Sequence, residues 1–172
     1  MDKIKGRVRK FGDNVDTDTI APGPSLLLPM EEMKKHAFSP VAPDFYSTVR
    51  EGDILVAGNN FGCGSSREQA TSVVKALGFR YVVCESMAKI YLRNCVGLGV
   101  YPILAKGVSR IFKEGDEIEI DLERGEVRNV RTGERASFEP LSGTPLEILK
   151  SGGILNVLKK RIDQGKQDAE KK

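Results

Sequence analysis

Two short apolar runs on either side of a helical segment constrain the fold of this chain more than any other feature. Residues 53–57 and 81–84 are too short for helices and are almost continuously apolar, which is typical of strands buried on both faces. Between them, residues 65–77 carry apolar side chains at i, i+3, i+4 and i+7 from Ala70, and Gly78 provides a stop signal. A strand–helix–strand unit this compact pairs its strands in parallel through a right-handed crossover, so we expect an α/β fold.

The rest of the chain adds strands on both sides of this unit. Residues 4–11 alternate loosely and predict a strand, and residues 100–105 predict another after a helix over residues 86–94. Residues 117–122 alternate charged and apolar side chains, and with a glycine turn and residues 126–130 they predict a β-hairpin. Further helices are expected over residues 30–38, 145–150 and 154–161, and a structured loop over residues 13–24. The sequence thus predicts a mixed sheet, parallel in one half and antiparallel in the other, with flanking helices.

The length of 172 residues fits one domain that can bury a core without disulfides or a structural metal. We assign residues 1–162 to this domain. Residues 163–172 are strongly charged and are expected to form a disordered tail.

The distribution of charge weighs against a nucleic-acid-binding or membrane protein. The chain has 27 Lys and Arg against 24 Asp and Glu, and residues 159–172 carry the whole excess of +3. Residues 1–158 are therefore neutral, whereas a nucleic-acid binder shows a basic face on its body. The uncharged stretch at residues 94–105 is too short to span a bilayer, and the start of the sequence lacks the apolar region of a signal peptide.

The cysteines point to a reducing compartment, and we expect the protein in the cytoplasm. Cys63, Cys84 and Cys95 are an odd number at wide spacing, unlike a disulfide framework. His36 is the sole histidine of the sequence. A zinc or iron–sulfur site made wholly by this chain is therefore not expected, and any metal chemistry would come from another chain.

The segment that carries chemistry is residues 59–68, between the buried strand and the helix. Ser65 is a good N-cap residue and Glu68 completes a capping box, while nearby glycines let the backbone approach a ligand. Arg67 stands in the predicted first turn, where a cation opposes the helix dipole. Serine hydroxyls, backbone N–H groups and a guanidinium there predict a site for a carboxylate or phosphate. The alternative is ordinary capping with Arg67 pointing to solvent.

Residues 62–68, Gly-Cys-Gly-Ser-Ser-Arg-Glu, resemble the signature of the swivelling domain of the aconitase superfamily. The resemblance is closest to the small subunits of 3-isopropylmalate dehydratase and their archaeal-type homologues, including homoaconitase. Residues 11–23, 57–61 and 85–94 resemble further motifs of this family in the same order. The match extends over residues 5–160 and implies the swivelling β/β/α domain, a mixed sheet or barrel with flanking helices.

This resemblance implies a hydro-lyase that isomerises a hydroxy diacid by dehydration and rehydration. The expected reaction converts 2-isopropylmalate to 3-isopropylmalate in leucine biosynthesis. It implies that a large subunit holds a [4Fe–4S] cluster, that this chain binds no cofactor or metal, and that activity requires a heterodimer or heterotetramer. Other diacids, such as 2,3-dimethylmalate, citramalate or homoaconitate, remain alternatives within the family. A stand-alone module that binds an anion or RNA is an alternative of another class.

The family's functional residues are carried over by position in the motifs. Ser65 would be the catalytic base, acting as an alkoxide that a positive environment must stabilise. Ser66, Arg67 and Gly64 would bind the substrate carboxylate, with Arg67 as a bidentate donor. Asp18 would orient or polarise the serine and its neighbours, although alone it could equally form an Asx turn.

Substrate choice in this family is associated with a loop that follows the first motif. Many members carry Tyr-Leu-Arg there, whereas this chain has Pro-Ser-Leu-Leu-Leu-Pro at residues 24–29. Leu26, Leu27 and Leu28 are therefore expected to line an apolar pocket for a branched alkyl group, with no cation for a further carboxylate. The alternative is that these leucines pack at a subunit interface.

Overall fold

The computed structural model describes residues 3–170, with side chains as far as residue 164, so residues 1–2 and 171–172 lie outside the description. A seven-stranded sheet runs in the order β4-β3-β2-β1-β5-β6-β7. Its strands are β1 (Ile4–Lys10), β2 (Ile54–Ala57), β3 (Tyr81–Cys84), β4 (Tyr101–Leu104), β5 (Glu117–Asp121), β6 (Glu126–Asn129) and β7 (Arg135–Ser137). The helices are α1 (Thr17–Ile20), η1 (Gly23–Leu27), α2 (Met30–Met33), η2 (Lys34–His36), α3 (Phe45–Thr48), α4 (Glu68–Ala76), α5 (Lys89–Leu98), α6 (Val108–Ile111), α7 (Gly143–Lys150) and α8 (Ile154–Glu170).

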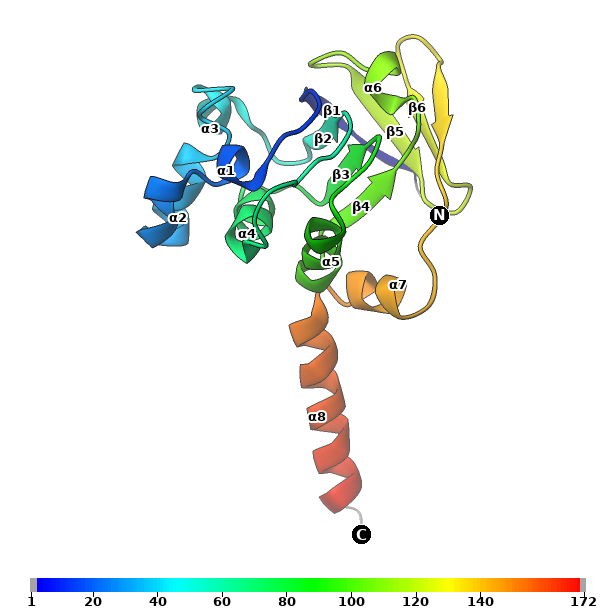
Figure 1. Ribbon diagram of the computed structural model, residues 1–172. Helices are drawn as coiled ribbons and strands as arrows, with labels where there is room; N and C mark the ends of the chain where they lie inside the picture. Colours follow the sequence, from blue (N-terminus) through cyan, green and yellow to red (C-terminus); the bar gives the residue numbers. More distant parts are fainter. Residues whose placement is uncertain (1–2, 171–172) are drawn as a thin grey trace.

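The parallel half of the sheet confirms the predicted strand–helix–strand unit. Strands β1, β2, β3 and β4 pair in parallel, with α4 connecting β2 to β3 and α5 connecting β3 to β4 (Figure 1). All four residues of β2 are buried, because the strand has neighbours on both sides and packed side chains on both faces. The prediction of an α/β fold with a mixed sheet and flanking helices is therefore confirmed.

The antiparallel half confirms the predicted hairpin and adds one strand. Strand β1 pairs with β5, β5 with β6, and β6 with β7. Gly125 forms the hairpin turn with φ of +65°, and a Cβ there would lie 2.2 Å from the carbonyl oxygen of Phe138. Strand β7 was not predicted, because it has three residues and buries only Ala136.

Aromatic rings attach the N-terminal loops and short helices to the sheet. The ring centroids of Phe11 and Phe38 lie 4.5 Å apart, those of Phe38 and Phe45 lie 4.8 Å apart, and those of Phe45 and Phe79 lie 5.9 Å apart. Each of these four side chains is buried in one core cluster. Such stacked and tilted contacts add to the hydrophobic stabilisation from burial, so residues 11–48 are fixed relative to β2 and β3.

Three helix boundaries differ from the sequence-based expectation. Helix α4 begins at Glu68 instead of residue 65, so the predicted capping box is wrong. The helix expected over residues 30–38 is divided into α2 and η2 and ends before Phe38, whose φ is +58°. Helix α5 begins at Lys89 instead of residue 86, because Met87 forms a bridge with Phe61. In each case a contact distant in sequence outweighs local helix preference.

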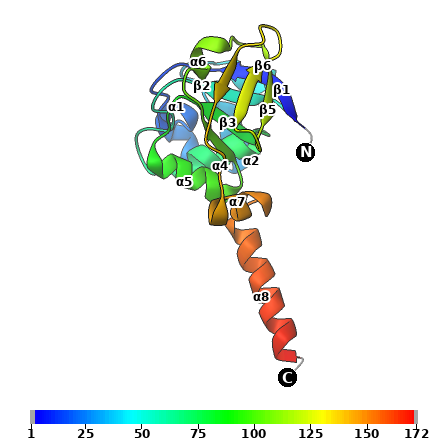
Figure 2. The same ribbon diagram turned by 90° about the vertical axis from the view of Figure 1, so that its right-hand side faces the viewer.

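Helix α8 projects away from the body of the molecule (Figures 1 and 2). Its backbone continues to Glu170 and so crosses the boundary that the sequence placed at residue 162. Within residues 3–170, no helix is long and apolar enough to cross a membrane.

Candidate functional site

The loops that follow β1, β2 and β3 meet at the carboxyl ends of these parallel strands, where α/β sheets place their ligands. The amide of Gly58 donates to the carbonyl of Gly12 at 3.0 Å, and that of Asn14 donates to Asn59 at 2.8 Å. The amide of Glu85 donates to the carbonyl of Gly58 at 3.1 Å. Backbone hydrogen bonds thus join three loops into one surface.

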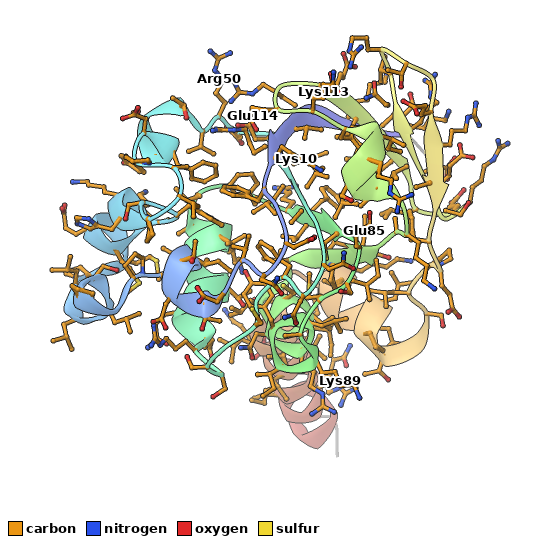
Figure 3. All side chains as sticks on the ribbon, turned by 45° about the horizontal axis from the view of Figure 1, so that its top comes forward. Lys10, Arg50, Glu85, Lys89, Lys113 and Glu114 are labelled. Atoms are coloured by element: carbon orange, nitrogen blue, oxygen red, sulfur yellow. The ribbon has the colours of Figure 1, made fainter. Side chains whose placement is uncertain are left out.

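Two charged side chains, Glu85 and Lys10, connect these loops to the segment that contains α6. Burial acts to raise the pKa of Glu85, but hydrogen bonds from the Ser109 hydroxyl at 2.5 Å and from the amides of Gly107 at 2.7 Å and Ser109 at 2.9 Å hold it below its usual range. Lys10 donates from Nζ to the carbonyl of Ser109 at 2.6 Å. Burial lowers the pKa of Lys10, and the Glu85 charge partly opposes this effect. Figure 3 shows Lys10 and Glu85 at the ends of β1 and β3.

Two asparagines hold the turn that leads into the signature loop. Asn14 and Asn60 both have positive φ, of 55° and 57°, a conformation that asparagine tolerates better than most residues. The Asn60 side-chain amide donates to Oδ1 of Asn14 at 3.0 Å, and its backbone amide donates to Oγ of Ser86 at 2.8 Å. These bonds fix the turn, and with it the start of the segment that carries Ser65.

Gly62 allows the signature loop to pass close to α5. Its φ is +72°, and a Cβ at this position would lie 2.2 Å from Cγ of Tyr91. The Gly62 amide donates to the carbonyl of Val15 at 2.8 Å, and the next residue, Cys63, pairs in parallel with Asp16. The loop is therefore held between α5 and the segment before α1, which explains why residues 62–65 are not helical.

Ser65 and Thr17 form the central polar contact of this loop. The Ser65 amide donates to Oγ1 of Thr17 at 3.1 Å, and the two hydroxyl oxygens lie 3.3 Å apart. Thr17 is 1% exposed and its own amide donates to the carbonyl of Cys63 at 2.8 Å, whereas Ser65 is exposed. A buried, fixed threonine thus positions an exposed serine.

Thr17 is a site residue that the sequence analysis missed. Residues 11–23 resemble a family motif, but Asp18 is the one residue of this segment to which the resemblance assigns a role. Asp16 accepts a hydrogen bond from the amide of Thr19 at 2.7 Å and so begins the short helix α1. The sequence held one indication of a role for Thr17: a run of polar residues at the start of a helix places several hydroxyl groups near a neighbouring loop.

Arg67 pairs with Asp18. Its Nη1 donates to Oδ1 of Asp18 and also to the carbonyl of Ala21 at 3.4 Å. The Asp18 side chain is 65% exposed, so this pair lies at the mouth of the site. Among the described side chains, Asp18 forms its polar contact with Arg67, the neighbour of the serine, and not with Ser65 itself.

The remaining predicted site residues differ in their environments. Gly64 and Ser66 are exposed beside Ser65, and Gly64 has φ of +101°. Leu26 is partly buried against the aromatic core, Leu28 is 38% exposed and Leu27 is 96% exposed. The three leucines therefore do not share one surface, and only Leu27 and Leu28 are open to a ligand or partner.

The cysteines of this chain do not fit the ligand set of an iron–sulfur cluster. Burial raises the pKa of the Cys84 thiol to about 12 and raises that of Cys95 as well, so both thiols stay protonated. Cys63 lies in the signature loop and is half-buried. Within the described side chains, no group of three or more His, Cys, Asp or Glu could hold a metal ion.

Comparisons with known proteins identify the family. The aconitase C-terminal domain family matches residues 29–107. The isopropylmalate/citramalate isomerase small subunit of Methanocaldococcus jannaschii is 46% identical over 160 residues, which cover 92% of this chain and 95% of that protein. The 3-isopropylmalate dehydratase small subunit 1 of Thermotoga maritima is 48% identical over 159 residues, covering 91% and 95%. This chain belongs to the same family of small subunits. The methanogen homoaconitase small subunit of Methanothermobacter thermautotrophicus, 45% identical over 163 residues and 94% of each chain, is a further relative.

A solved relative has the same fold. The crystal structure of 3-isopropylmalate dehydratase from Methanocaldococcus jannaschii matches with a TM-score of 0.89 and 43% identity, covering 96% of this chain and 99% of that one. The resemblance inferred from residues 62–68 is confirmed, and so is the swivelling-domain fold. The chain is thus the small subunit of an aconitase-type hydro-lyase.

Proposed function

We propose that this small subunit acts with a large subunit to isomerise an alkyl-substituted hydroxy diacid, with 2-isopropylmalate to 3-isopropylmalate as the expected reaction. The observation that carries the proposal is the pairing of an exposed Ser65 hydroxyl with the buried Thr17 hydroxyl at 3.3 Å, on the loop that also presents Arg67. This arrangement supplies a base and an anion-binding group on one rigid segment.

Ser65 is proposed as the base that removes a proton from the carbon next to a substrate carboxylate. Oγ1 of Thr17 already accepts the Ser65 amide, so the Thr17 proton is free to point at Oγ of Ser65. As an alkoxide, the Ser65 oxygen accepts this hydrogen bond, and a preorganised donor stabilises the negative charge that the oxygen carries before it takes the substrate proton. The electron pair of the broken C–H bond forms the C=C bond while the C–O bond at the neighbouring carbon breaks and hydroxide leaves. In rehydration hydroxide adds to the carbon that lost the proton, and Ser65 returns the proton to the other carbon.

Arg67 is proposed to bind a substrate carboxylate. Asp18 engages Nη1, so the planar guanidinium is oriented while its other N–H groups remain available. Ser66 and Gly64 are exposed beside it and would add a hydroxyl and an amide to the same carboxylate. In this proposal Asp18 is a positioning residue for Arg67.

The large subunit is proposed to hold a [4Fe–4S] cluster. In support, Cys84 and Cys95 are buried, and the described side chains include no group of three or more His, Cys, Asp or Glu that could hold a metal ion. When bound in the partner, the cluster would supply Lewis-acid polarisation of the departing hydroxyl. We propose a heterodimer or heterotetramer in the cytoplasm, with residues 1–162 as the swivelling domain and residues 163–172 as a charged tail.

The proposed preference for an alkyl substituent depends on Leu27 and Leu28. Both are exposed on the loop after α1, which here bears no cation for an additional carboxylate. Relatives named for isopropylmalate, citramalate and homoaconitate are about equally similar, at 44 to 48% identity, so overall identity does not separate the substrates. The loop is therefore the local feature that supports an alkyl-substituted malate.

The test is a substrate panel with the reconstituted complex of small and large subunits. We expect a higher kcat/KM for 3-isopropylmalate than for homoaconitate or citrate. Leu27→Arg should shift the preference towards tricarboxylates, and Leu26→Met should not, since Leu26 packs against the core. Equal turnover of homoaconitate and 3-isopropylmalate by the wild-type complex would contradict the substrate assignment.

A further inference from the structure

Helix α8 carries apolar side chains on a segment that leaves the body of the molecule (Figures 1 and 2). It contacts α5 and α7. Its apolar residues are nevertheless exposed: Ile154, Leu155, Leu158 and Ile162 are 38%, 75%, 46% and 58% exposed. These four residues, which we call the apolar stripe, recur at roughly helical spacing. A row of exposed apolar side chains on a projecting helix is typical of a docking surface.

The apolar stripe is continuous with the catalytic loop. A hollow of about 320 Å³ extends from Glu68, the residue after Arg67, past Arg93 of α5 to Ile154 and Leu155. A partner that covers Ser65 and Arg67 would therefore meet this hollow next and then the apolar stripe. One surface joins the site to α8.

The charges around this surface define the chemistry of its partner. Three exposed residues within the span of the apolar stripe are basic: Lys159, Lys160 and Arg161. Among the described side chains of α8, Asp163 is the one acidic residue. The hollow is lined by Lys75 and Arg93 against one carboxylate, Glu68. The complementary surface is an apolar groove with an acidic rim.

A second copy of this chain fits the apolar stripe poorly. To cover all four residues, the α8 helix of a second copy would have to cross the first α8 near Leu158, at the centre of the stripe. The basic residues 159–161 of both helices would then lie within about one turn of the crossing point and repel each other. Charge therefore favours a different, acidic partner.

We propose that the apolar stripe and the hollow are the docking surface for the large subunit, which would present an apolar groove with an acidic rim. The identity of this partner rests on the proposed function. The inference adds the place of contact: α8 anchors the partner, while the catalytic loop at the other end of the same surface faces the substrate.

The experiment measures the Kd of the purified full-length chain for its large subunit. Leu155→Asp with Leu158→Asp should weaken binding about tenfold or more, because it places charge where apolar side chains are buried. Val41→Asp is the matched control, since Val41 is 59% exposed between η2 and α3 and away from the stripe. Reversing the charges at residues 159–161 should slow the association of the two subunits and make the association rate less dependent on salt.

The outcomes separate this inference from the proposed function. An unchanged Kd for the double variant, with native circular dichroism, overturns the docking surface. It is also overturned if the wild-type chain alone forms a dimer in ultracentrifugation that the double variant abolishes, because a second copy then occupies the stripe. The proposed function fails instead if the wild-type complex forms with normal Kd but turns over no hydroxy diacid.

Discussion

The hydroxyl of Ser65 is exposed and has one described side-chain partner, Thr17, so its removal should affect chemistry more than folding. In the reconstituted complex, Ser65→Ala should lower kcat by about 10² to 10⁴, the usual contribution of a positioned base. The loss of one hydrogen bond should cost about 1 kcal/mol of stability. Steady-state kinetics and thermal unfolding measure both effects. Ser47→Ala, which also removes one exposed hydroxyl, is the control, and near-normal turnover by Ser65→Ala would refute the base assignment.

Thr17 is proposed to act through Ser65, and paired substitutions test the role of its hydroxyl. Thr17→Val keeps the shape but removes both contacts with Ser65, so kcat should fall by about 10-fold to 10³-fold, as for loss of an oxyanion donor. Thr17→Ser retains the hydroxyl and should restore most of kcat. The KM should change little in both variants. If Thr17→Ser is as impaired as Thr17→Val, Thr17 has only a packing role.

At the scale of residues, the sequence located the loop of the candidate site but not the residues that support this loop. A glycine-rich turn with Ser65 and Arg67 is a local pattern, so it could be recognised. The contact between Thr17 and Ser65 joins residues 48 positions apart, and the pairing of Asp18 with Arg67 joins residues 49 positions apart. No local pattern specifies such partners, because they depend on how two loops pack across the sheet.

Among the elements, strands β2 and β3 and helix α4 could be predicted because burial gives them a clear pattern of apolar residues. Helices α1, α3 and α6 have four residues each and were missed, since one turn shows no periodicity. The start of α4 was misplaced because Ser65 and Glu68 have the form of a capping box. The bridge between Asp16 and Cys63 holds the preceding residues in extended conformation instead.

The signature loop depends on the absence of a side chain at Gly62. Gly62→Ala should destabilise the chain by about 2 to 5 kcal/mol, from a clash with Tyr91 and from a φ of +72° that alanine disfavours. Gly133→Ala is the matched control: its φ is +77° and no atom lies within 4 Å of the added Cβ, so only the conformational cost of about 1 kcal/mol should remain. Urea unfolding of both variants gives the comparison, and equal destabilisation would show that the contact with Tyr91 does not matter.

The antiparallel half should make stability depend on pH through Asp116. Hydrogen bonds from Arg131, the amide of Lys113 and Asn129 lower the pKa of Asp116 from 3.8 to about 2. A carboxyl whose pKa is lower in the folded state stabilises the protein fully above its unfolded pKa, and the contribution is lost as the pH falls towards the folded value.

The corresponding variant, Asp116→Asn, should therefore be less stable than the wild type at neutral pH. The difference in free energy of unfolding between the two proteins should narrow as the pH falls from 3.8 to about 2. Urea unfolding across this range measures the effect, with Asp163→Asn on the exposed face of α8 as the control. A constant difference at all pH values would show that Asp116 acts by packing and not by its charge.

At the scale of the whole molecule, the exposure of the site indicates that this chain is incomplete as a catalyst. Ser65, Ser66 and Asp18 are exposed in the loops at the carboxyl ends of the parallel strands. Helix α8 extends away from the body of the molecule (Figure 1). In open water a serine alkoxide is strongly disfavoured, and the attraction between Arg67 and a carboxylate is screened. A covering partner that excludes water would strengthen both interactions.

The purified chain alone should therefore show no measurable dehydratase activity. Adding iron and sulfide without a large subunit should not produce activity, because Cys84 and Cys95 are buried with raised pKa values. The described side chains also include no group of three or more His, Cys, Asp or Glu that could hold a metal ion. Adding the cluster-loaded large subunit should restore turnover. The concentration of large subunit that gives half-maximal activity should equal the Kd from binding measurements. The assay follows absorbance of the unsaturated intermediate with and without each component. Turnover by the chain alone would show that the exposed loop is sufficient for catalysis, and it would remove the reason for a partner that completes the site.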